Sequence, residues 1–151
     1  MTLENIKCDV AIVGGGLAGG LIALALAKMR PELHVVLIEQ GQTFGGNHIW
    51  SYFASDILPE HRWLTAPLVT YGWSGYDVKF PAHNRSLDNI YYSIESEHFD
   101  QVLRKELPAS SLMLGREVRA VSPRLVVLDG AQRINAGGVI DARGAGDLHH
   151  Q

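Results

Sequence analysis

Residues 8–20 decide the fold of this chain and read Cys-Asp-Val-Ala-Ile-Val-Gly-Gly-Gly-Leu-Ala-Gly-Gly. The first six residues are mostly apolar and β-branched, and they predict a buried strand. That strand runs directly into a Gly-x-Gly-x-x-Gly turn. In such a turn Gly14 permits the tight bend, Gly16 lets the backbone approach a pyrophosphate, and Gly19 lets the next helix pack near the strand. The stretch therefore predicts a dinucleotide-binding turn.

The flanking sequence supplies the context that this turn needs. Residues 17–29 are rich in Leu and Ala and predict a helix, whose N-terminus would favour the phosphates. After a break at Pro31, residues 33–39 predict a second buried parallel strand. Glu39 ends this strand twenty positions after Gly19, where an acid accepts hydrogen bonds from ribose hydroxyls and repels a 2′-phosphate. The alternative is a βαβ unit that binds nothing, although its glycines would then weaken the helix without need.

Composition limits the class of protein. The 151 residues suffice for one domain, and 13 Lys+Arg against 16 Asp+Glu argue against nucleic acid as a partner. A single cysteine, Cys8, indicates a reducing, cytoplasmic location, and no Cys/His cluster suggests a metal site. Residues 10–27 carry no charge, but five glycines interrupt them, so we do not expect a membrane span. The composition is compatible with peripheral contact at the cytoplasmic face of a membrane.

The remainder of the chain predicts short strands and one more helix. Glycines mark residues 40–47 as a loop, and Pro59 and Pro67 bracket an irregular stretch. The expected elements are a hairpin (68–72 with 76–80), a strand (89–95), a helix capped by Ser96 and stopped by Pro108 (97–107), a meander (117–121, 125–128 and 133–135) and a returning strand (139–142).

This order of elements resembles the FAD domain of the two-dinucleotide-binding-domain flavoproteins of the glutathione-reductase type. Three further matches are Gly45-Gly46 after the ribose-binding acid, Phe99-Asp100 followed by Leu103 on the late helix, and Asp141-Ala142-Arg143-Gly144 at the end of the returning strand. The predicted fold class is therefore α/β: a Rossmann-like FAD-binding domain of glutathione-reductase type, partial, with an inserted β-meander. Residues 1–151 would form one N-terminal FAD/NAD(P)-binding domain.

A narrower resemblance rests on residues 45–51, which read Gly-Gly-Asn-His-Ile-Trp-Ser. This string resembles the Gly-Gly-Asn-His-x-Trp-Ser signature of bacterial lycopene β-cyclases, and the resemblance extends over nearly the whole chain. It implies reduced FAD maintained by NAD(P)H, and a redox-neutral, acid-catalysed cyclisation of lycopene through γ-carotene to β-carotene. Family members are more than twice this long, and their Phe-Leu-Glu-Glu-Thr-like acidic segment would lie beyond Gln151. Gly146-Asp147 does not correspond to their late Gly-Asp element. We therefore expect a truncated N-terminal portion that is inactive by itself.

The candidate cofactor-binding residues combine the turn, the loop and the late strand. They are Gly14, Gly16, Gly19, Glu39, Gln40, Gly46, Val118, Asp141, Arg143 and Gly144. Gln40 binds the adenosine ribose or only begins the loop. Val118 presents its backbone to adenine or is a core residue. Arg143 contacts phosphate or flavin, or pairs with an acid at the strand end.

The catalytic residues stay unknown at this level. His48 is a scaffold residue or, as the less favoured alternative, a proton donor. Six aromatic residues either line a polyene channel or simply pack, namely Trp50, Tyr52, Trp73, Tyr76, Tyr91 and Tyr92. Two rival functions stay open. One is another FAD-dependent oxidoreductase acting on an isoprenoid, either a reductase or a monooxygenase, and the other is a non-catalytic nucleotide-binding remnant.

Overall fold

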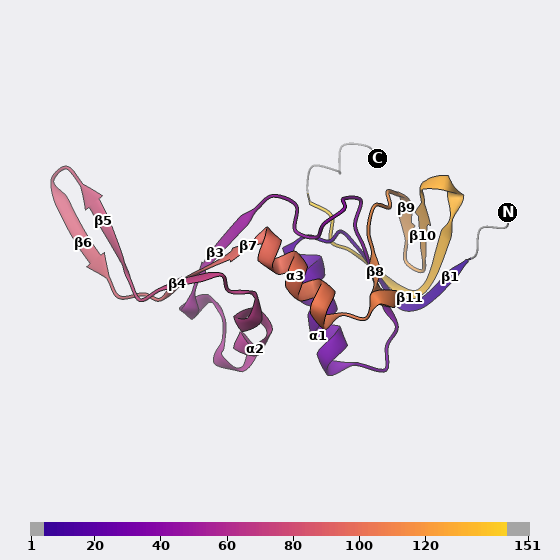
Figure 1. Cartoon of the computed structure of the whole chain (residues 1–151), viewed down its shortest axis with the longest axis horizontal. Helices are drawn as coiled ribbons and strands as arrows, with labels where there is room; N and C mark the ends of the chain where they lie inside the picture. The colour runs from indigo at the N-terminus through magenta and orange to yellow at the C-terminus, as the bar shows by residue number, and fades with distance from the viewer. Residues whose placement is uncertain (1–4, 145–151) are drawn as a thin grey trace.

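The computed structural model describes residues 5–144, and its main body is a six-stranded mixed sheet (Figure 1). The order of the strands is β8–β2–β1–β11–β10–β9. Neighbouring strands from β8 to β11 are parallel, whereas β10 pairs antiparallel with both β11 and β9. The strands are β1 (Ile6–Val13), β2 (Val35–Ile38), β8 (Leu112–Met113), β9 (Val118–Ser122), β10 (Leu125–Leu128) and β11 (Arg133–Asp141).

Two smaller sheets and three helices complete the described chain. One sheet has the order β3–β7–β4, and the other is the hairpin β5–β6. The strands are β3 (Ile49–Phe53), β4 (Tyr71–Trp73), β5 (Tyr76–Phe80), β6 (His83–Leu87) and β7 (Tyr91–Glu95). The helices are α1 (Leu17–Met29), α2 (Arg62–Thr65) and α3 (Ser96–Glu106), with 3₁₀ turns at Ala54–Asp56, Pro59–His61, Ala66–Leu68, Ala109–Ser111 and Asp129–Ala131.

The strand β2 is buried on both faces, which explains its unbroken apolar sequence. On one face Leu37 joins a cluster with residues of α1 and α3. On the other face Val36 and Ile38 join a second cluster with residues of β10 and β11. The predicted βαβ unit is thus confirmed, and the helix has the predicted bounds Leu17–Met29.

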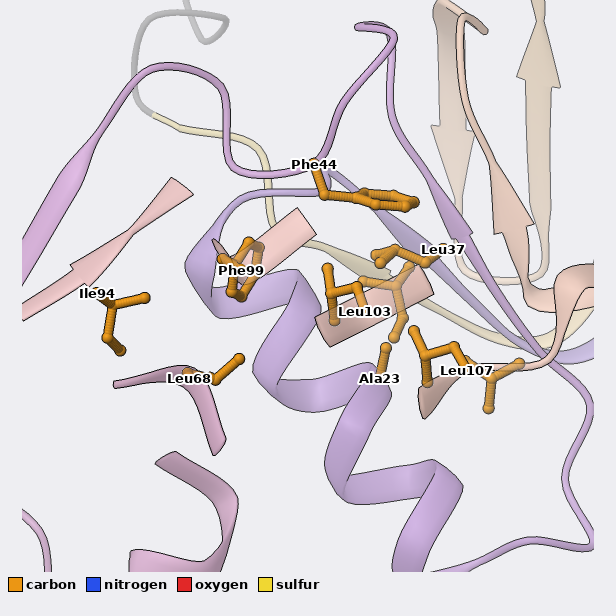
Figure 2. Close-up of a cluster of buried hydrophobic side chains, with 10 residues drawn as sticks. Ala23, Leu37, Phe44, Leu68, Ile94, Phe99, Leu103 and Leu107 are labelled. Atoms are coloured by element: carbon orange, nitrogen blue, oxygen red, sulfur yellow. The ribbon is translucent and has the colours of Figure 1, made fainter. Parts of the chain in front are cut away.

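The helices α1 and α3 pack closely because α1 carries a glycine at their contact. A Cβ at Gly20 would lie 2.3 Å from the ring of Phe99. Phe99 and Leu103 are fully buried, and Figure 2 shows them in one cluster with Leu37 of β2 and Phe44 of the following loop. This cluster fixes the loop after β2 against α3. The predicted N-cap differs by one residue, since Glu95 occupies that position and Ser96 is the first helical residue.

The predicted hairpin of residues 68–72 with 76–80 is wrong. Strand β4 pairs with β7, and β5 pairs with β6, a strand that the sequence analysis missed. Strand β6 reads His-Asn-Arg-Ser-Leu, which lacks the β-branched and aromatic residues that mark a strand. The stretch between Pro59 and Pro67, predicted to be irregular, forms short helical turns.

The third strand of the predicted meander and the predicted returning strand are one continuous strand, β11. Gly137 and Gly138 interrupt the hydrophobic pattern there, but the strand continues through them beside β1. A Cβ at Gly137 would lie 2.8 Å from the backbone oxygen of Asp9, so glycine serves the close approach of the two strands. The predicted Gly146-Asp147 loop and the His149-His150 pair lie outside the described residues. Among residues 5–144, no helix is both long and apolar enough to cross a bilayer.

Candidate cofactor site

A cleft of about 1000 Å³ opens where β1, β2 and β11 end, and it extends along β9. Carboxyl ends of parallel strands are where open α/β sheets bind ligands. All predicted cofactor residues except Gly19 line this cleft, and His48 lines it as well. The predicted lining residues are Gly14, Gly16, Glu39, Gln40, Gly46, His48, Val118, Asp141, Arg143 and Gly144.

The three glycines of the fingerprint meet three different steric demands. Gly14 has φ +106°, and a Cβ there would lie 2.9 Å from the carbonyl of Ala142 at the end of β11. A Cβ at Gly19 would lie 2.0 Å from the carbonyl oxygen of Gly14, so Gly19 lets the helix contact the turn. A Cβ at Gly16 would meet no atom within 4 Å. Gly16 therefore leaves open space in the cleft at the start of α1, where an anion would lie.

The carboxylate of Glu39 is held in place by the backbone on both of its oxygens. Its Oε2 accepts a hydrogen bond from the N–H of Gly15 at 2.9 Å. Its Oε1 accepts one from the N–H of Gly41 at 2.8 Å. Because a carboxylate oxygen can accept two hydrogen bonds, each retains capacity for a ribose hydroxyl. The acid is thus oriented at the end of β2 by the protein itself.

The loop that follows β2 is fixed by α3 and by the fingerprint turn. The N–H of Gly45 donates to the carbonyl of Gly15 at 2.8 Å. The N–H of Phe44 donates to Oδ1 of Asp100 at 2.8 Å, and Arg104 donates to Oδ2 of Asp100 at 2.8 Å. Arg104 also donates to the backbone carbonyl oxygen of Gln42 in this loop, at 2.9 Å. Asp100, which the sequence analysis matched to flavoproteins as part of Phe99-Asp100, thus anchors this loop to α3.

Both glycines of the Gly45-Gly46 pair have positive φ, at +81° and +63°. A Cβ at Gly45 would also lie 3.0 Å from atoms of Phe99 and of Trp50. Glycine is thus required at Gly45 by both conformation and packing. Gly46 then exposes its backbone to the cleft.

The end of β11 carries an ion pair. Arg143 donates from Nε and Nη2 to the two carboxylate oxygens of Asp141, at 2.9 and 2.6 Å. Hydrogen bonding from Arg143 lowers the pKa of Asp141 below its ordinary value. Of the two alternatives for Arg143, the structure shows the pairing with an acid, and it does so within the cleft lining.

The wall formed by β9 and the two residues before it includes charged residues that sequence reasoning missed. Arg116, Glu117 and Arg119 line the cleft together with Val118. Arg116 donates to Oδ1 of Asp129 at 3.0 Å and to Gln132 at 2.6 Å. Nothing in the sequence distinguishes these charged residues from an ordinary stretch of solvent-exposed residues. Val118 lines the cleft and also packs partly against the second hydrophobic cluster, and its contact with adenine stays a prediction.

His48 has a structural role at the cleft rim. Its backbone carbonyl accepts a hydrogen bond from the N–H of Ser96 at 3.0 Å, and its N–H donates to Oγ of Ser96 at 3.3 Å. Its ring lies 5.7 Å from that of Trp50, centroid to centroid. The backbone of His48 thus joins the loop to the start of α3, while its side chain is exposed. The choice between a scaffold residue and a proton donor stays a prediction.

Within residues 5–144, the six aromatics proposed for a channel pack in more than one place, and their contact with a polyene stays a prediction. Trp50 and Tyr52 pack against the first hydrophobic cluster. Trp73, Tyr76 and Tyr91 instead gather elsewhere, in an aromatic group with Phe53. None of the six lines the cleft. Strand pairing places these two groups of aromatics apart, and the pairing cannot be read from the sequence.

Solved structures share this arrangement of sheet and helices. An oxygenase of 2-methyl-3-hydroxypyridine-5-carboxylic acid superposes with a TM-score of 0.68 at 18% identity, over 95% of this chain and 40% of its own. A protein of Photorhabdus luminescens described as an FAD-containing monooxygenase superposes with a TM-score of 0.58 at 16% identity, over 92% of this chain and 40% of its own. At such identities the likeness concerns the fold. The sheet order and the superpositions define a Rossmann-like fold of the kind found in these proteins, as predicted.

The chain belongs to the lycopene cyclase family. The family model described as "Lycopene cyclase protein" matches residues 9–151. The lycopene beta-cyclase of Pseudescherichia vulneris is 46% identical over 137 residues, which are 90% of this chain and 35% of that protein. The chain therefore spans about a third of the length of this curated relative.

Proposed function

We propose that the cleft binds FAD through its ADP moiety. The observation that carries this proposal is the Glu39 carboxylate, which two backbone N–H groups hold beside the opening at Gly16. A carboxylate in that position suits the 2′- and 3′-hydroxyls of an adenosine ribose and repels a 2′-phosphate. Gly16 and the N-terminus of α1 would then receive the pyrophosphate.

The other lining residues would complete the cofactor site. Val118 would present its backbone to the adenine, and Gln40 would lie near the ribose. Gly46 and Gly144 would let the backbone approach the bound dinucleotide, and Arg143 would offer a positive charge to phosphate or flavin from its pairing with Asp141. Gly19 would act indirectly, by keeping α1 against the turn.

We further propose that this chain supplies the flavin-binding part of a lycopene cyclase. The support is its family membership and its 46% identity to a lycopene beta-cyclase. The reaction would be redox-neutral, with NAD(P)H as reductant of the flavin, and would close lycopene through γ-carotene to β-carotene. Reduced FAD, when bound, would supply an electron-rich ring that stabilises cationic charge.

The residues of this chain would bind and orient the cofactor, and the acid that protonates the polyene would come from elsewhere in a complete enzyme. The chain spans about a third of its relative, so we expect it to be inactive by itself. A cytoplasmic location, with contact at the membrane surface where an apolar carotenoid dissolves, is part of the same proposal.

Calorimetric titration tests the cofactor proposal. The folded chain should bind FAD and ADP, and it should bind adenosine 2′,5′-bisphosphate at least tenfold more weakly than AMP, which differs from it only by the 2′-phosphate. Far-UV circular dichroism would establish that the protein is folded during the titration. A folded chain that binds neither FAD nor ADP would refute the assignment.

Incubation with lycopene distinguishes the proposed activity from its rivals. With FAD, NADPH and lycopene-loaded liposomes, the chain should yield no γ-carotene or β-carotene by chromatography. Formation of a ring would contradict the expected inactivity. Saturated or oxygenated products with stoichiometric loss of NADPH would instead indicate a reductase or a monooxygenase. Flavin binding without activity, even after addition of the missing part of a relative, would favour a nucleotide-binding remnant.

A further inference from the structure

The sheet β3–β7–β4 presents two faces of different character. Residues directly opposite each other in an antiparallel pair lie on the same face. Trp50 opposite Ile94 belongs to the inner face, which packs against the first hydrophobic cluster. Phe53 and Trp73 both lie opposite Tyr91, one on each side, and belong to the outer face.

The outer face is an ordered aromatic surface that stays accessible. We call it the outer aromatic face, comprising Phe53, Tyr71, Trp73, Tyr76 and Tyr91. Ring centroids lie 5.3 Å apart for Phe53 and Tyr91, and 5.9 Å apart for Trp73 and Tyr91. Tyr71 is 52% exposed and Trp73 is 47% exposed. A contiguous aromatic patch of this kind on a folded domain marks a contact surface.

The hairpin β5–β6 continues this surface as an amphipathic arm. One face carries Tyr76 opposite Leu87, Val78 opposite Arg85, and Phe80 opposite His83, so it is mostly apolar with one cation. Asp77 opposite Ser86 lies on the other face. Among the described residues the arm pairs only with itself, and Figure 1 shows it reaching away from the main body. A two-stranded hairpin is marginally stable alone in water. Its apolar face and unpaired strand edges can therefore bind another segment of polypeptide.

We propose that the outer aromatic face and the β5–β6 arm dock the part of a lycopene cyclase that this chain does not match. The matched region makes up 35% of the P. vulneris relative, so about two thirds of that protein must pack against something. The free edges of β4 and of the arm offer unpaired backbone groups for strand addition. The proposal rests on family membership and is independent of FAD binding.

The charge of the arm favours protein over lipid as the occupant. Its strands carry Lys79 and Arg85 against Asp77. Anionic lipid surfaces are recognised by clusters of about four to eight basic residues. An aromatic face with unpaired strand edges and little net charge is suited to pack against the apolar face of another folded protein segment.

Complementation tests the docking surface. The chain would be co-expressed with a tagged segment of the P. vulneris enzyme that begins where the match ends, and the complex isolated by gel filtration. We expect a one-to-one complex in which hydrogen exchange slows at residues 71–91. Y71S/W73S should weaken it at least tenfold, whereas M29S, at a 69% exposed site on α1, should not. Far-UV circular dichroism of each variant reports folding, and FAD titration reports the cofactor site separately.

Several outcomes would overturn the proposal. They are absence of a complex, protection confined to other regions, equal affinity of Y71S/W73S and M29S, and a homodimer of the chain that the same double substitution dissociates.

A chimera keeps the proposal testable if the separate segment is insoluble. In it, the unmatched part of the relative would follow residue 144 in one chain. With W50F and W63F, Trp73 is the remaining tryptophan of this portion, and tryptophans of the added part would be replaced by Phe. Acrylamide quenching of Trp73 should fall at least threefold relative to the 151-residue chain with the same substitutions. Unchanged quenching would refute docking at this face.

Discussion

Replacing Gly19 by Ala should destabilise the protein, although the same change in an exposed helix normally stabilises it. Alanine is favoured over glycine inside a helix by about 1 kcal/mol. At Gly19, however, the new Cβ would lie 2.0 Å from the carbonyl oxygen of Gly14. Either α1 or the turn must move, and overpacking of this kind costs about 1–3 kcal/mol. We expect the steric cost to exceed the gain in helix propensity.

Urea unfolding followed by far-UV circular dichroism measures this effect. A net loss of about 1 kcal/mol would lower the urea midpoint by about 0.5 M for a domain of this size. Gly16→Ala is the matched control, since its Cβ meets no atom within 4 Å, and it should change the midpoint little. That control should still weaken FAD binding, because its methyl group enters the cleft. A Gly19→Ala midpoint equal to or above that of the wild type would refute the steric reasoning.

Three further changes test other parts of the site. Glu39→Gln should weaken FAD binding by about tenfold, because hydrogen bonds to a charged acceptor contribute about 1.5–3 kcal/mol. It should also reduce discrimination against a 2′-phosphate. An unchanged affinity in calorimetric titration would contradict this expectation. Asp100→Ala should lower the free energy of unfolding by about 1–3 kcal/mol, since it leaves a loop N–H without its acceptor, while Glu97→Ala on the same helix should not. The Asp141 ion pair should stabilise the fold by less than about 1 kcal/mol. Because the pKa of Asp141 is lowered in the folded state, this stability is present above the unfolded pKa of about 3.9 and is lost as the pH falls through the folded pKa. The difference between wild type and Asp141→Asn should thus shrink in urea titrations below about pH 4, and a pH-independent difference would contradict it.

The elements with strong local signals were predicted from the sequence with close bounds. The helix Leu17–Met29 and the glycine turn before it follow from short-range sterics, which sequence spacing records. The predicted strands of residues 68–72 and 76–80 were mispaired, because pairing partners are chosen by long-range contacts and β6, the true partner of β5, carries no strand signal. The continuity of β11 was missed because Gly137 serves a contact with β1 that only the assembled sheet reveals.

The sequence by itself determined the family, the βαβ unit and the glycines and strand-end residues of the cleft, since each depends on residue types at fixed spacing along the chain. The tertiary structure decided how those residues are held: Glu39 by two backbone N–H groups, Arg143 by Asp141, and the glycine loop by Asp100. It also decided that the aromatic residues divide between two faces of one sheet. These features depend on contacts between segments far apart in sequence, and those contacts exist only once the strands have paired.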